Sequence, residues 1–151
     1  LGTPVASTSG TSIDFTGIPS GTKDIRISFN NVSTNGTSVL LVQIGGSGGI
    51  ETSGYVSAGE DNSGRTTSTA GFILSRVQAA ADVVSGTMLL MLENSSSFTW
   101  TEIGIVYQPT TTSVPHSAGI KSLSAELGRV RITTVNGTDA FDGGEVNIQF
   151  I

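Results

Sequence analysis

A serine flanked by two pairs of glycines is the first feature of this sequence that could do chemistry. The string Gly45-Gly46-Ser47-Gly48-Gly49 has the G-x-S-x-G spacing of the nucleophile elbow in serine hydrolases. An elbow needs a strand before the serine and a helix after it, because the helix N-terminus helps to stabilise the oxyanion. An apolar strand is predicted before the serine, but residues 50–55 (IETSGY) do not favour a helix. We therefore interpret the glycines as a turn.

Two further catalytic interpretations of this region fail on the sequence. A phosphate-binding loop needs a Lys-Ser/Thr pair and a helix after the glycines, and neither follows here. A triad in the chain order Ser47, Asp82 and His116 would use the only histidine and an arbitrary aspartate. We predict no catalytic residue and no enzyme activity.

Acidic side chains gather in two loop segments, one at Glu60 and Asp61 and the other between 139 and 145. Neither segment matches the D-x-[DN]-x-[DN]-G pattern of a calcium loop, although acidic loops of β-sandwiches do sometimes hold Ca²⁺. Asp, Asn and Gly are also good turn residues, and we favour that interpretation. No metal or cofactor is predicted.

Two aromatic residues could stack on a sugar, because their rings join an apolar face to a polar group. Tyr55 follows Gly54 in a segment rich in turn residues and is expected to be exposed. Trp100 alternates with Phe98 in a strand, which favours a position in the core or in a subunit interface. The single histidine, His116, lies between prolines and serines in a loop, where a solvated side chain is the default expectation.

The composition predicts that strands position these groups. Charged residues make up 13% of the 151 residues, whereas about 25% is usual, and Gly, Ser, Thr and Asn take their place. These residues disfavour helices, so an all-β fold is expected. Alternation supports strands: Ile25, Ile27 and Phe29 share one face of residues 24–30. Asn35-Gly36 predicts a hairpin turn to a return strand at 38–44.

Later segments carry similar signals, with some ambiguity. Residues 54–67 are predicted to form a long exposed loop with a short strand at 55–56, and residues 75–84 could form one or two helical turns. In 97–108 the apolar residues change parity, which predicts a bulge near Glu102. Further strands are predicted at 70–74, 87–93, 121–127, 129–135 and 145–151.

Two strands, Leu40 to Ile44 and Met88 to Leu92, are apolar on both faces. A small two-layer sandwich covers only one face of each sheet, so each strand is covered either by a partner subunit or by a loop of its own chain. The two explanations weigh about equally. In total, we count nine or ten strands at the 8–12-residue spacing that is typical of β-sandwiches and barrels, and we expect an antiparallel β-sandwich.

Charge and cysteine content exclude several classes of function. The net charge is −5 and the seven Lys and Arg residues are scattered, so no nucleic-acid partner is expected. No apolar run is long enough for a membrane span, and the chain has no cysteine for a disulfide framework. The chain opens on Leu1 rather than methionine, which we interpret as a piece of a longer protein.

Four strings in the sequence resemble the C-terminal module of tailed-phage and prophage tail fibre or tailspike proteins. The strings are GTP with SGTSIDFTGIPSGTK in 2–23, VSTNGTS in 32–38, GIETSGY in 49–55 and RVRITTVNGTDAFD in 129–142, and the resemblance extends over nearly the whole chain. The resemblance implies a jelly-roll-like β-sandwich in a homotrimer at the tip of a virion fibre. In this organisation residues 1–12 are a linker or weak edge segment, and residues 13–151 form a single sandwich domain.

The resemblance also implies a function. The domain would bind a bacterial surface polysaccharide or lipopolysaccharide through exposed loop groups, with Tyr55, Asp61, Asn62 and Arg65 as candidates, and His116 and Trp100 as weaker ones. Two alternatives stay open. The domain could only trimerise and assemble the fibre, or it could be a fragment of a polysaccharide depolymerase.

Overall fold

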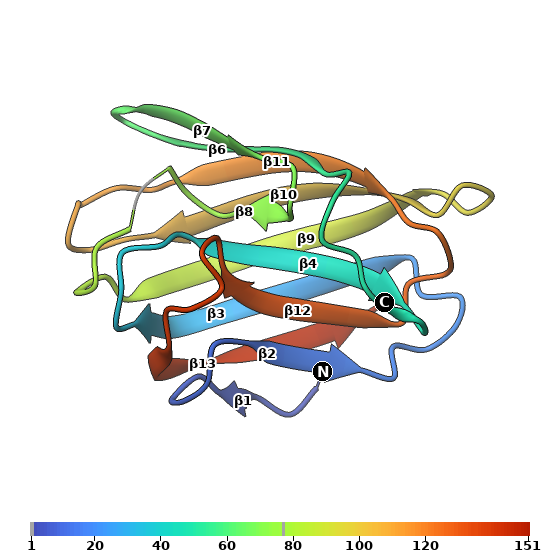
Figure 1. Cartoon of the computed structure of the whole chain (residues 1–151), viewed down its shortest axis with the longest axis horizontal. Helices are drawn as coiled ribbons and strands as arrows, with labels where there is room; N and C mark the ends of the chain where they lie inside the picture. Colours follow the sequence, from blue (N-terminus) through green and yellow to red (C-terminus); the bar gives the residue numbers. More distant parts are fainter. Residues whose placement is uncertain (1, 77) are drawn as a thin grey trace.

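The computed structural model describes residues 2–76 and 78–151 and is built of antiparallel strands (Figure 1). No helix occurs among these residues, which confirms the all-β expectation. The strands are β1 (Val5–Ala6), β2 (Ile13–Thr16), β3 (Asp24–Thr34), β4 (Leu40–Gly46), β5 (Gly49–Ile50), β6 (Val56–Asp61), β7 (Gly64–Ser68), β8 (Phe72–Ile73), β9 (Val84–Asn94), β10 (Thr99–Tyr107), β11 (His116–Ser122), β12 (Arg129–Thr134) and β13 (Phe141–Phe150).

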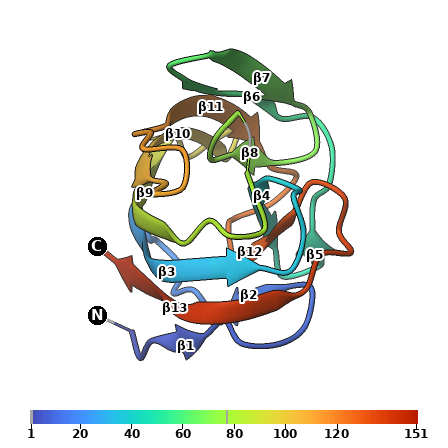
Figure 2. The same cartoon turned by 90° about the vertical axis from the view of Figure 1, so that its left-hand side faces the viewer.

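The strands form two sheets in a sandwich-like arrangement (Figures 1 and 2). The large sheet has the order β1-β13-β3-β9-β10-β11-β6-β7, and the small sheet has the order β2-β12-β4-β5, with β8 paired to β4. The described residues thus hold thirteen strands, against the nine or ten predicted, and three of these, β1, β5 and β8, are only two residues long. The N-terminal segment supplies β1, which pairs with β13 at one end of the large sheet.

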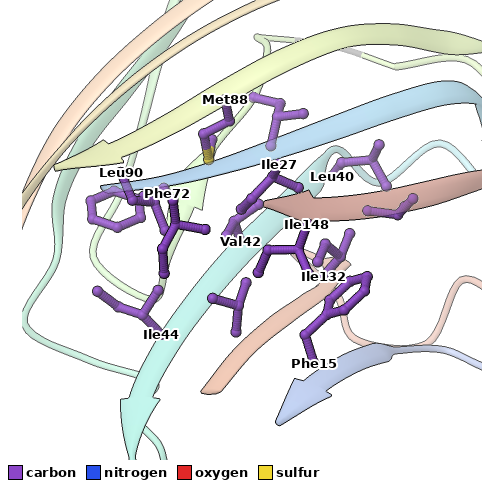
Figure 3. Close-up of a cluster of buried hydrophobic side chains, with 14 of the residues drawn as sticks. Phe15, Ile27, Leu40, Val42, Ile44, Phe72, Met88, Leu90, Ile132 and Ile148 are labelled. Carbon is purple, nitrogen blue, oxygen red and sulfur yellow. The ribbon is translucent and has the colours of Figure 1, made fainter. Parts of the chain in front are cut away.

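One hydrophobic core lies between the sheets (Figure 3). The predicted alternation in β3 is confirmed, because Ile25, Ile27 and Phe29 are buried while Asp24 and Arg26 are exposed. Facing side chains from the small sheet include Val42 and Ile132, both fully buried. Period-2 alternation places these side chains on one face of each strand, and their burial is the main favourable term in folding.

The two strands that are apolar on both faces have different surroundings. In β4 both faces are covered by the chain itself: Val42 points into the main core, whereas Leu41 packs with Ile73 in a second small cluster. In β9 only one face is covered, because Met88 and Leu90 are buried while Leu89 and Met91 are exposed. The loop explanation therefore holds for β4, whereas none of the described residues covers the outer side of β9 completely.

Several local predictions are wrong. Asn35-Gly36 does not close a hairpin, because β3 lies in the large sheet and β4 in the small one, so this turn connects the two layers. Residues 54–67 form a β6–β7 hairpin rather than a loop. Residues 75, 76 and 78–83 contain turns and no helix, and Val77 lies outside the described residues. Residues 123–127 form no strand, because β11 ends at Ser122.

The glycine-rich string forms a tight hairpin between β4 and β5. Ser47 and Gly48 form the turn, while Gly45 pairs with Ile50 and Gly46 pairs with Gly49. A Cβ at position 45 would lie 2.0 Å from the carbonyl oxygen of Gly49, so only glycine lets the two strands approach this closely. The segment is therefore a turn, as interpreted, and the helix that an elbow requires does not follow it.

Candidate functional site

The two aromatic candidates are buried and cannot offer a ring face to a sugar. The Tyr55 side chain is 1% exposed, so the expectation that it lies in an exposed loop is wrong. Its hydroxyl accepts a hydrogen bond from the Ile44 N–H at 2.8 Å and lies 2.9 Å from the carbonyl oxygen of Glu51. Burial raises the pKa of this hydroxyl well above its usual value. The ring meets Phe72 edge-on at 5.0 Å, so Tyr55 fixes the segment after the hairpin.

Trp100 lies on the inner side of β10 and is 2% exposed. It belongs to the main core, which confirms the core alternative for this residue. The predicted bulge near Glu102 is wrong: β10 pairs with β9 without interruption from Trp100 to Tyr107, and the register shifts between Thr99 and Trp100 instead.

The β6–β7 hairpin carries three of the predicted site residues at one end of the large sheet (Figure 1). Asp61 is held within the protein, because its carboxylate accepts hydrogen bonds from the Ser63 N–H at 2.7 Å and from Arg76 at 3.0 Å. Burial alone would raise the pKa of Asp61, but these bonds outweigh it and lower that pKa. Asn62 is exposed at the turn, three residues before Arg65 of the returning strand.

Arg65 and His116 are brought together by a third residue, Glu60. The register pairs His116 of β11 with Glu60 of β6, and Glu60 with Arg65 of β7, so the three side chains form one row across three strands. His116 Nε2 lies 3.1 Å from one carboxylate oxygen of Glu60, and Arg65 Nε lies 3.3 Å from the other. All three side chains are at least 40% exposed. We call this row the polar cluster.

The polar cluster borders a shallow hollow of about 230 Å³. Its floor is made of small residues, Ala58, Gly59 and Ala118, which leave room beside the charged groups. The arrangement offers a carboxylate, a guanidinium and an imidazole to the same small volume. Such a set can bind polar groups such as hydroxyls by hydrogen bonds in both directions. In the sequence Glu60 was noted only as part of an acidic pair. The strand register was needed to place it between Arg65 and His116.

Next to the polar cluster, the outer side of the large sheet is apolar over four adjacent strands. Two rows of paired residues run across β9, β10, β11 and β6, and they contain no charged residue: Met91, Thr101, Ile120 and Val56 in one, and Leu89, Ile103, Ala118 and Ala58 in the other. We call this surface the apolar face and include in it the neighbouring exposed side chains Ile105, Tyr107 and Val114.

The parity change within 97–108 was the signal for the apolar face. Apolar residues were expected to point inward throughout this strand. Because the apolar residues have even numbers up to Trp100 and odd numbers from Ile103 onward, a bulge between the two sets was predicted. The strand instead keeps its phase, with Glu102 inside and Ile103 and Ile105 outside at 46% and 56% exposure. Outward-facing positions of an antiparallel sheet are usually polar, so this face is unusual for a surface in contact with water.

The remaining chemical candidates are dispersed among separate partners. His116 contacts Glu60, whereas Asp82 is buried and accepts a hydrogen bond from the Ala79 N–H at 2.7 Å. The acidic residues near 139–145 likewise bond to different groups: Asp139 to the Ser38 N–H at 2.8 Å, and Glu145 to Asn30 at 3.0 Å. Over the described part of the chain, no group of three or more His, Asp and Glu side chains is arranged to hold a metal ion.

Comparison with models of known protein families finds none that matches the chain, and a search of curated proteins finds no significant match. No described segment is a helix that could cross a lipid bilayer. The functional conclusion therefore depends on the two features of the large sheet, the polar cluster and the apolar face.

Proposed function

We propose that this chain is a non-enzymatic receptor-binding module from the tip of a phage tail fibre or tailspike, and that it binds a bacterial surface polysaccharide or lipopolysaccharide. The observation that carries the proposal is the polar cluster, in which Glu60 lies between His116 and Arg65 above a hollow floored by small residues. Sugar hydroxyls both donate and accept hydrogen bonds, and this cluster can accept them through the carboxylate and donate them through the guanidinium.

The position of the polar cluster also suits a sugar. Ile105 pairs with His116 across β10 and β11, so an apolar side chain stands beside the charged row. A sugar has polar hydroxyls and apolar C–H faces, and a mixed site of this kind contacts both. Asn62 on the hairpin turn adds an exposed amide close to Arg65 in the chain. Each contact is weak, and three copies in one assembly raise the avidity for a glycan. The proposal therefore includes the homotrimer that the resemblance implies. It also includes the jelly-roll-like fold of the module.

Retention on immobilised glycans tests this proposal. The probes are purified lipopolysaccharides and capsular polysaccharides from a panel of bacteria, together with whole cells of the same strains. We expect retention on at least one surface of the panel and competition by the free polysaccharide. Absence of retention on every surface, with a folded protein, would overturn the proposal.

Assembly of fibre subunits is a second candidate function, and a different observation favours it. The apolar face is wide and free of charge in its middle rows, and its large side chains are exposed in the part of the chain that the structure describes. The depolymerase alternative has less in its favour. Glycoside hydrolysis uses two carboxyl groups about 5–9.5 Å apart, whereas the polar cluster contains one carboxylate, that of Glu60. We expect no release of reducing ends from any polysaccharide that the protein retains.

A further inference from the structure

The apolar face is comparable in size with the apolar part of a subunit interface. Its eight large side chains are Val56, Leu89, Met91, Ile103, Ile105, Tyr107, Val114 and Ile120, and their exposed fractions run from 36% to 69%. With about 60–120 Å² of apolar area for a large side chain exposed in full, they present roughly 250–450 Å² of apolar surface. The largest apolar patch on a typical monomer is about 300–600 Å² and is often functional. A standard interface buries about 800 Å² on each partner, of which a little over half is apolar.

The relief of the apolar face is complementary to itself. Leu89, Ile103 and Ile105 are large exposed side chains on the outer side of β9 and β10, and we call them the ridge. Beside the ridge, on β11 and β6, the face is hollowed over Ala118 and Ala58, where open depressions of about 470 and 360 Å³ lie. The ridge of one copy can therefore fill the hollow of another. Both are apolar, so their contact removes water from the two surfaces together.

Charges lie only along the borders of the apolar face and carry both signs. On the β3 side, Asp24 pairs with Met91 and Arg26 pairs with Leu89. On the opposite side, the polar cluster supplies Glu60, Arg65 and His116. This arrangement has an apolar centre and a polar rim, which is the anatomy of specific protein interfaces. Because each border carries an acid and a base, two copies can meet without a surplus of like charges.

We propose that the apolar face packs against the apolar face of another copy of this chain, with the ridge of one copy in the hollow of the next. A two-fold arrangement buries ridge and hollow against one partner, whereas a three-fold ring buries them against two neighbours. Glu60, Arg65 and His116 lie at the rim of this contact, whereas Ala58, Ala118 and Ile105 belong both to the packed face and to the surroundings of the polar cluster, so packing leaves only the rim side of that cluster open to a glycan. This inference rests on the assembly function proposed above and does not depend on glycan binding.

Light scattering of the purified chain over a dilution series gives the molar mass, and a charged variant tests the face. We expect the wild-type protein to be an oligomer and Ile103→Glu to be a monomer. A trimer agrees with the homotrimer of the proposed function, whereas a dimer would keep the face as an interface and contradict that homotrimer. Val135→Glu is the matched control, because Val135 is also half-exposed, at 53%, but lies outside the face next to β12. We expect this control to keep the wild-type mass.

Cysteine accessibility provides a measurement that does not depend on a disruptive substitution. The chain has no cysteine, so a single introduced thiol reports on one position. The thiol of Ala118→Cys, in the floor of the hollow, should be alkylated more slowly as protein concentration rises, whereas that of Thr138→Cys, exposed in a distant turn, should not change. A wild-type monomer at every concentration overturns both the assembly function and this inference. Association without protection of the thiol at position 118 would show that the apolar face is not the interface, and it would leave the assembly function unaffected.

Discussion

Replacing Glu102 by glutamine should change how the stability of the protein depends on pH. Glu102 lies on the inner side of β10 and is 3% exposed. One carboxylate oxygen accepts a hydrogen bond from the Ser117 hydroxyl at 2.7 Å, and the other has no partner among the described residues. Burial raises the pKa of Glu102 from 4.5 to about 7, although the bond from Ser117 acts in the opposite direction.

The sign and size of the effect follow from this shift. Because the pKa of Glu102 is higher in the folded state than in the unfolded state, its contribution is most favourable below pH 4.5 and is lost as the pH rises to about 7. At about 1.4 kcal/mol per pKa unit, the loss amounts to about 3 kcal/mol. Glutamine keeps the shape and cannot ionise. The Glu102→Gln variant should therefore gain about 3 kcal/mol relative to the wild type between pH 4 and pH 8.

Urea unfolding of both proteins over this pH range measures the difference, and the titrations of all other carboxyl groups cancel in it. A second variant, Ser117→Ala, removes the hydrogen bond that favours the ionised carboxylate, so the pH-dependent loss should move to higher pH. A stability difference between Glu102→Gln and wild type that stays constant with pH would refute the reasoning. It would mean that this carboxyl group does not titrate differently in the folded protein.

Two further predictions concern the β4–β5 hairpin and the ion pair that follows it. Gly45→Ala should destabilise the protein by about 1–3 kcal/mol, because the new Cβ would meet the Gly49 carbonyl oxygen. Gly48→Ala should be near neutral, because nothing lies within 4 Å of the position of its Cβ. Equal losses of stability of the two variants in thermal unfolding would contradict the packing argument. Lys121 is 6% exposed and its Nζ lies 2.5 Å from Glu51, so Lys121→Met should cost about 1.5–3 kcal/mol by removing the charged donor to this carboxylate, which keeps its bonds from Ser124. Glu51→Gln in the same chain should recover part of this loss, and a purely additive double-mutant cycle would show that the pair is not coupled.

Much of the strand content could be predicted from the sequence because period-2 alternation reports burial directly. In β3, apolar and polar residues alternate and the core takes the apolar ones, as at Ile25 and Ile27. Connections between strands were harder to predict. Asn35-Gly36 favours a tight turn, but turn chemistry is local and does not reveal that the next strand joins the other sheet. The β6–β7 hairpin was missed because its strands are rich in Gly, Ser and Thr rather than apolar residues.

The candidate site could be predicted only in part, because it depends on register and on the direction of side chains. Arg65 and His116 were both chosen from the sequence, but their meeting at Glu60 requires the pairing of β11, β6 and β7. Tyr55 was assigned to a loop because of the glycine before it, although a tertiary hydrogen bond to the Ile44 backbone holds it inside. The outward direction of the apolar residues of β10 could not be predicted from one sequence, because the usual pattern of a strand places apolar side chains toward the core.

The measurement that tests the proposed binding function most directly compares retention of three proteins on the same glycan surface. These are the wild type, Arg65→Ala, and the control Lys23→Ala, which loses the same charge from an exposed position outside the polar cluster. Surface plasmon resonance on a lipopolysaccharide or capsule that retains the wild type should show about a tenfold or greater loss of affinity for Arg65→Ala, since a hydrogen bond to a charged group is worth about 1.5–3 kcal/mol. The control should bind like the wild type. Equal affinity of all three proteins would contradict the assignment of the polar cluster as the glycan site.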